Sequence, residues 1–190
     1  AAGELRSDPD QRRAAERLDR LQKDLEAESS GGLLSQLFRA RKANPQGVYM
    51  WGGVGRGKSM LMDLFVETLG IDEKRRVHFH EFMLEVDRRI RERRESDPGD
   101  PTGKVARDIA QDVRCLAFDE MVVNNTADAA IMARLFTALI RDQGVTIVTT
   151  SNRPPRDLYK DGLNRSLFLP FIDLIDTDLD VVSLNGPTDY

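Results

Sequence analysis

The chain of 190 residues contains few of the residues that build covalent or metal-based scaffolds, with one cysteine, Cys115, and two histidines. A single cysteine excludes an internal disulfide framework and is typical of a reducing compartment. No apolar run approaches the roughly 20 residues that cross a bilayer, so the sequence indicates no membrane-spanning helix. Neither charge sign dominates, because the sequence has 28 Lys and Arg residues and 32 Asp and Glu residues. The net charge of −4 therefore gives no overall electrostatic case for nucleic-acid binding.

Composition favours one globular domain, since 40% of the residues are hydrophobic and 32% are charged. The first residues carry no signal-peptide pattern, and their acidic content argues against a transit peptide. We therefore expect a cytoplasmic protein.

The most informative segment matches the phosphate-binding loop G-x-x-x-x-G-K-[ST] of nucleoside-triphosphatases. It consists of Gly52, Gly53, Val54, Gly55, Arg56, Gly57, Lys58 and Ser59, followed by Met60. Glycines let successive backbone N–H groups turn inward around a phosphate. Lys58 can neutralise the β- and γ-phosphates, and the Ser59 hydroxyl can bind Mg²⁺. The segment predicts ATP and Mg²⁺ as cofactors, although no motif here identifies the base.

The surroundings of this loop fit the mechanism. Residues 47–51 have the composition of a short buried strand, and the apolar residues after the loop recur at helical spacing. A loop between a strand and a helix directs the positive end of the helix at the phosphates. A merely flexible glycine-rich turn explains this context less well.

The order of elements predicts an α/β fold with a parallel five-stranded sheet flanked by helices. The expected strands are residues 48–51, 76–80, 113–118, 145–150 and 181–184. Residues 1–46 are expected to form an N-terminal helical segment, with a second short helix at 33–42, and residues 47–190 the nucleotide-binding domain. Residues 96–103 resemble a loop, and Pro170 is expected to kink a helix over 167–175.

Two carboxylates, Asp119 and Glu120, follow the apolar third strand. In phosphate-loop enzymes an acid at this place holds Mg²⁺, so Asp119 joins Ser59 as a candidate metal ligand. Glu120 can polarise a water for in-line attack on the γ-phosphate. An acidic turn is common by itself, but its position after a phosphate loop favours the catalytic interpretation.

Two further polar residues are candidates for the catalytic site. Asn152, after the fourth strand, can orient the attacking water, or it can be a turn former ahead of Pro154. Arg165 can complete the site of a neighbouring subunit as an arginine finger, or it can be a solvated surface residue. The positions of Asn152 and Arg165 in the sequence do not decide between the catalytic and the structural role of either residue.

Two other patterns favour structural interpretations. His78 and His80 are expected on one face of the second strand, where a hydrogen-bonding role is favoured over zinc because the sequence holds no third histidine. The arginines between residues 88 and 94 alternate with acids. They therefore indicate a solvated helix face more than a nucleic-acid surface.

Several linked motifs resemble those of the ZapE-type cell-division ATPases, a bacterial AAA+ family with mitochondrial relatives. The resemblance covers the chain from about Asp8 to Tyr190. The matching segments are V-H-F-H-x-F-M at 77–83, F-D-E at 118–120, T-S-N-R-x-P at 150–155, D-L-Y-K-x-G-L-x-R at 157–165 and F-L-P-F-I at 168–172.

The resemblance implies ATP hydrolysis in bacterial cell division, with FtsZ as the partner. It also implies a location at the division site on the inner face of the membrane, with peripheral proximity only. It favours a sensor role for Asn152 and a finger role for Arg165, acting in trans within a homo-oligomer. It marks His78 and His80 as family hallmarks without explaining them.

The sequence departs from the family pattern in two ways. Met121 and Asn125 stand where the family usually has Phe and Asp. The family also continues into a C-terminal helical lid, which is absent from these residues. Two alternatives therefore stay open: a nucleotide-gated FtsZ-binding module with little hydrolysis, and a DNA-associated protein like the AAA+ helicase loaders, against which the acidic composition argues. A GTPase is disfavoured because the sequence has no Asn-Lys-x-Asp motif.

Overall fold

The computed structural model describes residues 8–30, 44–96, 99–123 and 126–185. Within these residues the centre is a parallel five-stranded sheet in the order β2-β3-β4-β1-β5. Its strands are β1 (Gly47–Trp51), β2 (Lys74–His78), β3 (Cys115–Asp119), β4 (Thr146–Ser151) and β5 (Leu179–Ser183). The predicted α/β fold class is confirmed. Parallel pairing brings the carboxyl ends of all five strands to one edge of the sheet.

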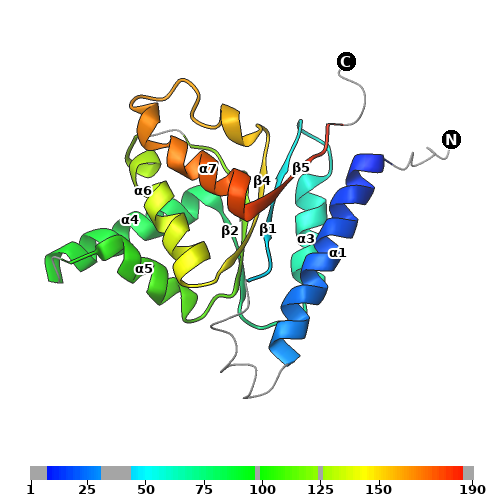
Figure 1. The fold of residues 1–190 in the computed structure, drawn as a ribbon, viewed down its shortest axis with the longest axis horizontal. Coiled ribbons are helices and arrows are strands. Elements are labelled where there is room, and N and C mark those ends of the chain that lie inside the picture. Colours follow the sequence, from blue (N-terminus) through cyan, green and yellow to red (C-terminus); the bar gives the residue numbers. More distant parts are fainter. Residues whose placement is uncertain (1–7, 31–43, 97–98, 124–125, 186–190) are drawn as a thin grey trace.

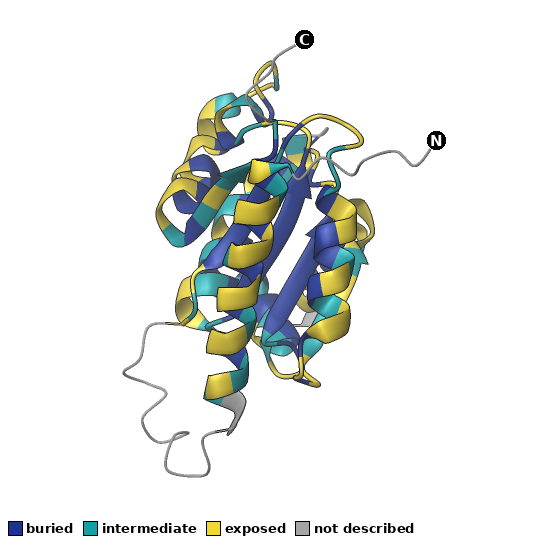
Figure 2. Ribbon diagram, turned by 90° about the vertical axis from the view of Figure 1, so that its right-hand side faces the viewer, coloured by how far each residue is buried: buried dark blue, intermediate teal, exposed yellow. Residues whose placement is uncertain are grey.

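Helices cover both faces of the sheet (Figure 1). One face carries α1 (Pro9–Ser30) and α3 (Lys58–Thr68). The other carries α4 (Phe79–Ser96), α5 (Pro101–Ala110), α6 (Thr126–Thr137) and α7 (Leu169–Asp178). Figure 2 shows helices with exposed outer faces in front of buried strands. The short segments are the π-helical turn η2 (Ala138–Asp142) and the 3₁₀ turns η3 (Pro155–Asp157) and η4 (Arg165–Leu167).

Helix α1 begins at Pro9, within the segment that the sequence predicts to be helical. The Asp8 carboxylate accepts a hydrogen bond from the Asp10 backbone N–H, which caps the first turn. The apolar stripe of α1 then packs in one hydrophobic cluster with the inner face of α3. Its members are Ala14, Leu18, Leu21 and Leu25, all buried. The N-terminal segment thereby contributes side chains to the same core as the helix that follows the phosphate-binding loop.

The opposite face is held by aromatic rings. Phe79 and Phe82 of α4 contact Phe118 of β3 edge to face, with centroids 5.7 and 4.7 Å apart. Phe136 of α6 joins them and contacts Phe171 of α7. These rings are all buried, and such edge contacts add to the burial of apolar area. The cluster fixes β3, whose last residue is Asp119, against three helices.

Several sequence-based assignments differ from the structure, and three of the differences change how a residue is interpreted. The second strand ends at His78, and α4 begins at Phe79, so His80 lies in a helix and the two histidines do not share a strand face. Residues 101–103 belong to α5, whose first turn is capped by Asp100 with Pro101 at the helix start. Pro170 lies in the first turn of α7, where a missing N–H costs nothing, and it starts that helix instead of kinking it.

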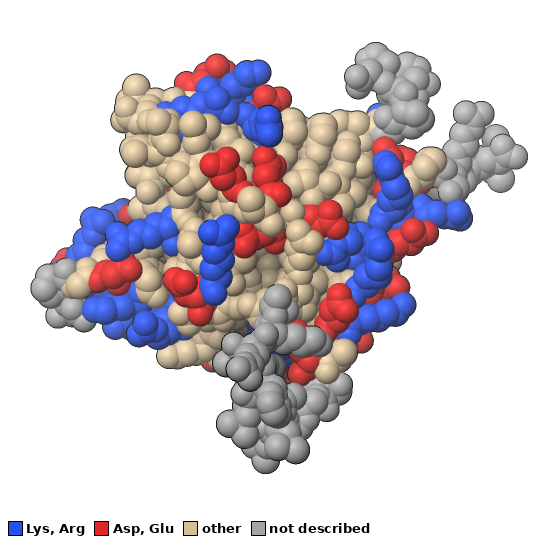
Figure 3. Space-filling model, viewed as in Figure 1, with Lys and Arg blue, Asp and Glu red and all other residues tan. Residues whose placement is uncertain are grey.

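Three arginines of α4 are paired with acids of the same helix, as the alternating pattern suggests. Arg88 contacts Glu92 and Arg91 contacts Asp87, both one turn away, and Arg89 contacts Glu85 at 2.7 Å. Figure 3 shows basic and acidic side chains interspersed over one face of the molecule. These ion pairs lie at or near the surface, so they neutralise charge locally and contribute little stability.

The expected helix at 33–42 and the departure at Asn125 lie outside the described residues. In the part of the chain that is described, no helix combines the length and the apolar character needed to cross a membrane.

Candidate functional site

The glycine-rich loop runs from the end of β1 at Trp51 to the start of α3 at Lys58. Gly55 and Gly57 have φ angles of 77° and 79°, a left-handed conformation that side chains disfavour. Gly57 occupies the N-cap of α3 and offers no side-chain cap. The first N–H groups of α3 therefore have no capping side chain to compete with an anionic ligand.

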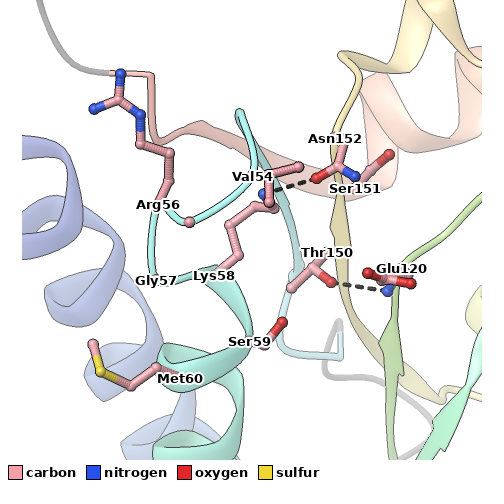
Figure 4. Close-up of a pocket in the computed structure, with 11 residues that line it drawn as sticks. Val54, Arg56, Gly57, Lys58, Ser59, Met60, Glu120, Thr150, Ser151 and Asn152 are labelled. Carbon is pink, nitrogen blue, oxygen red and sulfur yellow. Dashed lines mark hydrogen bonds between the residues drawn. The ribbon is translucent and has the colours of Figure 1, made fainter.

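The Lys58 ammonium lies folded over the loop in a nearly buried position. Its Nζ donates to the carbonyls of Gly52 and Gly53 at 2.6 and 2.7 Å, and to Asn152 Oδ1 at 3.0 Å (Figure 4). Burial lowers the pKa of Lys58, while the charges of Asp119 and Glu120 act in the opposite direction. All three hydrogen-bond partners are neutral oxygens, so an anion entering the loop would find a poorly compensated positive charge.

Asp119, the last residue of β3, is the meeting point of three strands and one helix. Its Oδ1 accepts hydrogen bonds from Ser59 Oγ of α3 at 3.1 Å and from Thr150 Oγ1 of β4 at 2.9 Å. Its Oδ2 accepts from Arg76 Nη2 of β2 at 3.1 Å. The two predicted metal ligands are thus in direct contact.

Glu120 follows in an unusual backbone conformation, with φ of 55°. Its backbone N–H donates to Thr150 Oγ1 at 3.0 Å, and its side chain is exposed at the site (Figure 4). A positive φ in a residue other than glycine costs free energy and is enriched at functional sites. The turn separates the two acids, because Asp119 points back into the sheet and Glu120 lines the open cavity.

The cavity at this edge of the sheet has a volume of about 340 Å³. It is lined by Val54, Gly55, Arg56, Gly57, Lys58, Ser59, Met60, Glu120, Thr150, Ser151 and Asn152. Most of the predicted site residues therefore lie around one cavity. Gly52, Gly53 and Asp119 support it from behind through the contacts described above.

Arg165 lies elsewhere. It belongs to η4, which packs on α6 and α7, on the side of the sheet away from α3 (the orange segment before α7 in Figure 1). Its Nη2 donates to the Arg156 carbonyl at 2.6 Å, and its buried Nε has no acceptor among the described residues. Arg165 does not line the cavity around Lys58.

Four residues hold this site together without having been singled out for that role in the sequence. Thr150 bridges the two acids, and Arg76 binds Asp119 from the edge strand. Asn185, after β5, accepts the Gly53 N–H at 2.9 Å, and the Gln11 amide of α1 donates to the Arg56 carbonyl at 3.1 Å. Of these four residues, only Thr150 could have been identified from the sequence, because it lies in the T-S-N-R motif at 150–153.

The oxygen ligands at the site fit a divalent cation of the Mg²⁺ type. Ser59 offers a hydroxyl and Asp119 a carboxylate, and their oxygens lie 3.1 Å apart beside the phosphate-binding loop. Hard cations of this kind take oxygen ligands and are usually held by one or two protein side chains together with phosphates. By contrast, among the described residues no group of three or more His, Cys, Asp or Glu side chains is arranged to hold a metal.

The fold and the site together define a P-loop domain of the AAA+ type. A strand–loop–helix unit, an acid on the third strand and a polar residue on the fourth converge at one edge of a parallel sheet. Domain III of the replication initiator DnaA from Thermotoga maritima superposes with a TM-score of 0.55, covering 96% of this chain and 65% of that one, at 18% identity. DnaI superposes with a TM-score of 0.53, covering 80% of this chain and 78% of that one, at 16% identity. At these identities the likeness establishes the fold.

The chain belongs to the AFG1-like ATPase family, which it matches over residues 1–190. It is 43% identical over 145 residues to the Escherichia coli cell division protein ZapE, covering 76% of this chain and 38% of the relative. It is 44% identical over 155 residues to lactation elevated protein 1 homolog B of Danio rerio, covering 77% of this chain and 31% of the relative. The chain thus spans about a third of the length of these curated relatives.

The bridging role of Thr150 generates a stability prediction. We expect Thr150→Val to lower the free energy of unfolding by about 1–3 kcal/mol, because the part-buried Glu120 N–H loses its acceptor and the buried Asp119 carboxylate loses a donor. Urea denaturation measures this. Thr149→Val is the matched control, since the Thr149 hydroxyl makes only a 3.5 Å contact with the Thr150 carbonyl. Equal losses in both variants would contradict the bridging role.

Proposed function

We propose that this chain binds ATP and hydrolyses it at the cavity around Lys58. The observation that carries the proposal is the contact between Ser59 and Asp119 beside a buried ammonium. A phosphate loop by itself explains binding. An acid brought to the same hydroxyl from another strand adds the means to hold a phosphate-bound cation.

Binding rests on the loop and on Lys58. The backbone N–H groups between Gly53 and Ser59 would hold the phosphate oxygens, and the start of α3 adds its positive end. Lys58 would exchange its contacts with the Gly52 and Gly53 carbonyls for the phosphates. The exchange is favourable because a charged acceptor makes a stronger hydrogen bond than a neutral carbonyl.

Ser59 and Asp119 would hold Mg²⁺. When bound, this ion neutralises charge on the phosphates during transfer. The Asp119 carboxylate is kept in place by Thr150 on one oxygen and Arg76 on the other. Its orientation is thus set before any ligand arrives, which limits the reorganisation needed at the moment of reaction.

Hydrolysis would use Glu120 and Asn152. The Glu120 carboxylate lines the cavity and would accept a proton from the attacking water. Asn152 Oδ1 accepts a hydrogen bond from Lys58, which supports the proposal that its amide would lie near a ligand bound by Lys58. Asn152 would therefore orient the water or read the γ-phosphate, and its release from Lys58 would accompany binding.

Replacing the proposed base gives the central test. We expect Glu120→Gln to keep ATP affinity within about threefold and to lower turnover by about 10²- to 10⁴-fold, because general-base catalysis contributes that much. Fluorescent-nucleotide titration and phosphate release measure the two quantities. Glu81→Gln, an exposed acid in the first turn of α4, is the control and keeps full turnover.

Two other outcomes of that experiment have defined meanings. If the unaltered chain binds ATP and releases no phosphate, it is a nucleotide-gated binding module and the hydrolysis proposal fails. If Glu120→Gln turns over at the original rate, Glu120 is not the base, whatever the family membership.

Arg165 would act in trans, in the site of a neighbouring copy. The loop before Arg165 is held in place by a hydrogen bond, in which the Tyr159 hydroxyl donates to the Leu163 carbonyl at 2.9 Å. Gly162 lies against the Tyr159 ring so closely that an added Cβ would fall 2.2 Å from it. Arg165 follows directly on Asn164, which adopts a left-handed φ of 56°. Because Arg165 does not line the cavity around its own Lys58, its guanidinium would leave the Arg156 carbonyl and act in the cavity of another copy.

A mixing experiment tests the action in trans. Arg165→Ala is expected to lower turnover by about 10³-fold or more, the effect of arginine fingers. Adding Glu120→Gln chains, which keep Arg165, is expected to restore part of that turnover. Lys160→Ala, a neighbouring exposed cation paired with Asp157, is expected to retain activity. Absence of any recovery on mixing would return Arg165 to the role of a surface residue.

We further propose a role in bacterial cell division on the FtsZ ring, in the cytoplasm at the inner face of the membrane. The support is the 43% identity to a protein named for cell division, together with the motifs that resemble that family. The shared fold of DnaA and DnaI carries no corresponding argument for DNA, because their identities to this chain are below 20%.

Co-sedimentation tests the partner. We expect the chain to pellet with FtsZ polymers, more with ATP than without, and Lys58→Ala to lose the ATP-dependent part because it loses phosphate binding. FtsZ-free samples provide the baseline. Pelleting no greater than that baseline, with or without ATP, would remove FtsZ from the proposal and leave the ATPase proposal intact.

A further inference from the structure

Arg76 occupies an unusual position between two carboxylates. Its Nη2 contacts Asp119 Oδ2 at 3.1 Å and Asp63 Oδ1 at 2.7 Å. Both acids therefore approach the same nitrogen atom. The three residues come from three different elements, because Arg76 lies on β2, Asp63 on α3 and Asp119 at the end of β3.

The two carboxylate oxygens of Asp119 have different hydrogen-bond donors. Oδ1 faces the Ser59 and Thr150 hydroxyls, at the side of the phosphate-binding loop. Oδ2 faces only Arg76 among the hydrogen-bond donors described. The Asp119 side chain is 11% exposed and that of Arg76 34%, so this ion pair is less screened than a surface pair.

The position of this nitrogen is one that a divalent cation could take. Two carboxylate oxygens, from Asp63 and Asp119, converge on this point, and carboxylate oxygens are ligands that Mg²⁺ and Mn²⁺ prefer. Without a positive charge between them, the two acids would also repel each other. The guanidinium supplies that charge and fills the space.

We propose that Arg76 is a positioning residue that acts as a built-in counter-charge for Asp119. It excludes divalent cations from the gap between Asp63 and Asp119 while no nucleotide is bound. Asp119 Oδ2 stays paired with Arg76, and Oδ1 remains available to the cation that arrives with the nucleotide. This inference rests on the proposed role of Asp119 as a metal-binding acid.

The neighbouring arginine provides a built-in comparison. Arg75 lies one position earlier on the same strand and pairs with Glu85 of α4, on the other face of the sheet from Asp63. The two arginines have the same charge and both bind acids. Of these two arginines only Arg76 contacts Asp119, so only the loss of Arg76 should change the affinity of the site for divalent cations.

Manganese binding to the nucleotide-free 190-residue chain tests the proposal, with free Mn²⁺ measured by electron paramagnetic resonance. We expect Arg76→Ala to bind one Mn²⁺ at least about tenfold more tightly than the unaltered chain, because a cation beside the two acids is removed. Arg76→Lys keeps the charge and is expected to bind weakly, like the unaltered chain. Arg75→Ala, the matched control, is expected to do the same.

A second substitution locates the gained site. Adding Asp63→Asn to Arg76→Ala is expected to abolish the tighter Mn²⁺ binding, because one of the two converging carboxylates is lost. Thermal unfolding of each variant identifies any that fail to fold. Arg76→Met keeps the aliphatic stem of the side chain and replaces Arg76→Ala in that case, with the same expected gain in Mn²⁺ affinity.

Two results would overturn the inference: a folded Arg76→Ala or Arg76→Met chain with unchanged Mn²⁺ affinity, or a gain that survives Asp63→Asn. The proposed function has its own readout, the Mg²⁺ dependence of ATP turnover in Asp119→Asn. If that variant loses the Mg²⁺ dependence while Arg76→Ala gains no Mn²⁺, only the counter-charge role fails. If Asp119→Asn keeps turnover and Mg²⁺ dependence, the metal-binding role of Asp119 fails.

Discussion

The hydrogen bond between Ser59 Oγ and Asp119 Oδ1 connects the two halves of the site. Ser59 belongs to the helix after β1, whereas Asp119 ends β3, and β4 lies between these two strands in the sheet. Their contact therefore requires the parallel register of three strands, with Phe118 opposite Thr149 and Met50 opposite Thr150. Because a slip of one residue would turn each side chain to the opposite face, the core packing on both sides of the sheet protects this contact.

Charge balance is the second organising feature of the site. Lys58 rests on neutral carbonyl and amide oxygens, so its positive charge remains available to an anion. Asp119, in contrast, has its negative charge matched by Arg76 and by two hydroxyls. The site thus holds an under-compensated cation next to a well-held anion. That arrangement suits a phosphate chain with a bound cation better than a neutral ligand.

The sequence was sufficient to predict the fold class, the five strands and the placement of the phosphate-binding loop, because these depend on local patterns. Boundaries failed where two patterns overlap. The segment around Phe79 is rich in aromatic residues, as strands are, but Phe79, Phe82 and Val86 recur at helical spacing and bury one helix face. The roles of Thr150 and Arg76 depend on neighbours 31 and 43 residues away along the chain. Nothing in the local sequence distinguishes Arg76 from Arg75, since only the pleat of β2 decides which one faces Asp119.

The most direct test of the central claim is a crystal structure of this chain with a non-hydrolysable ATP analogue and Mg²⁺. The account predicts the phosphates in the loop between Gly53 and Ser59, with Lys58 Nζ withdrawn from the Gly52 and Gly53 carbonyls and bound to phosphate oxygen. It also predicts Mg²⁺ within reach of Ser59 and Asp119 Oδ1. An analogue bound at another place, or Lys58 still on its own loop carbonyls with the analogue present, would contradict the account.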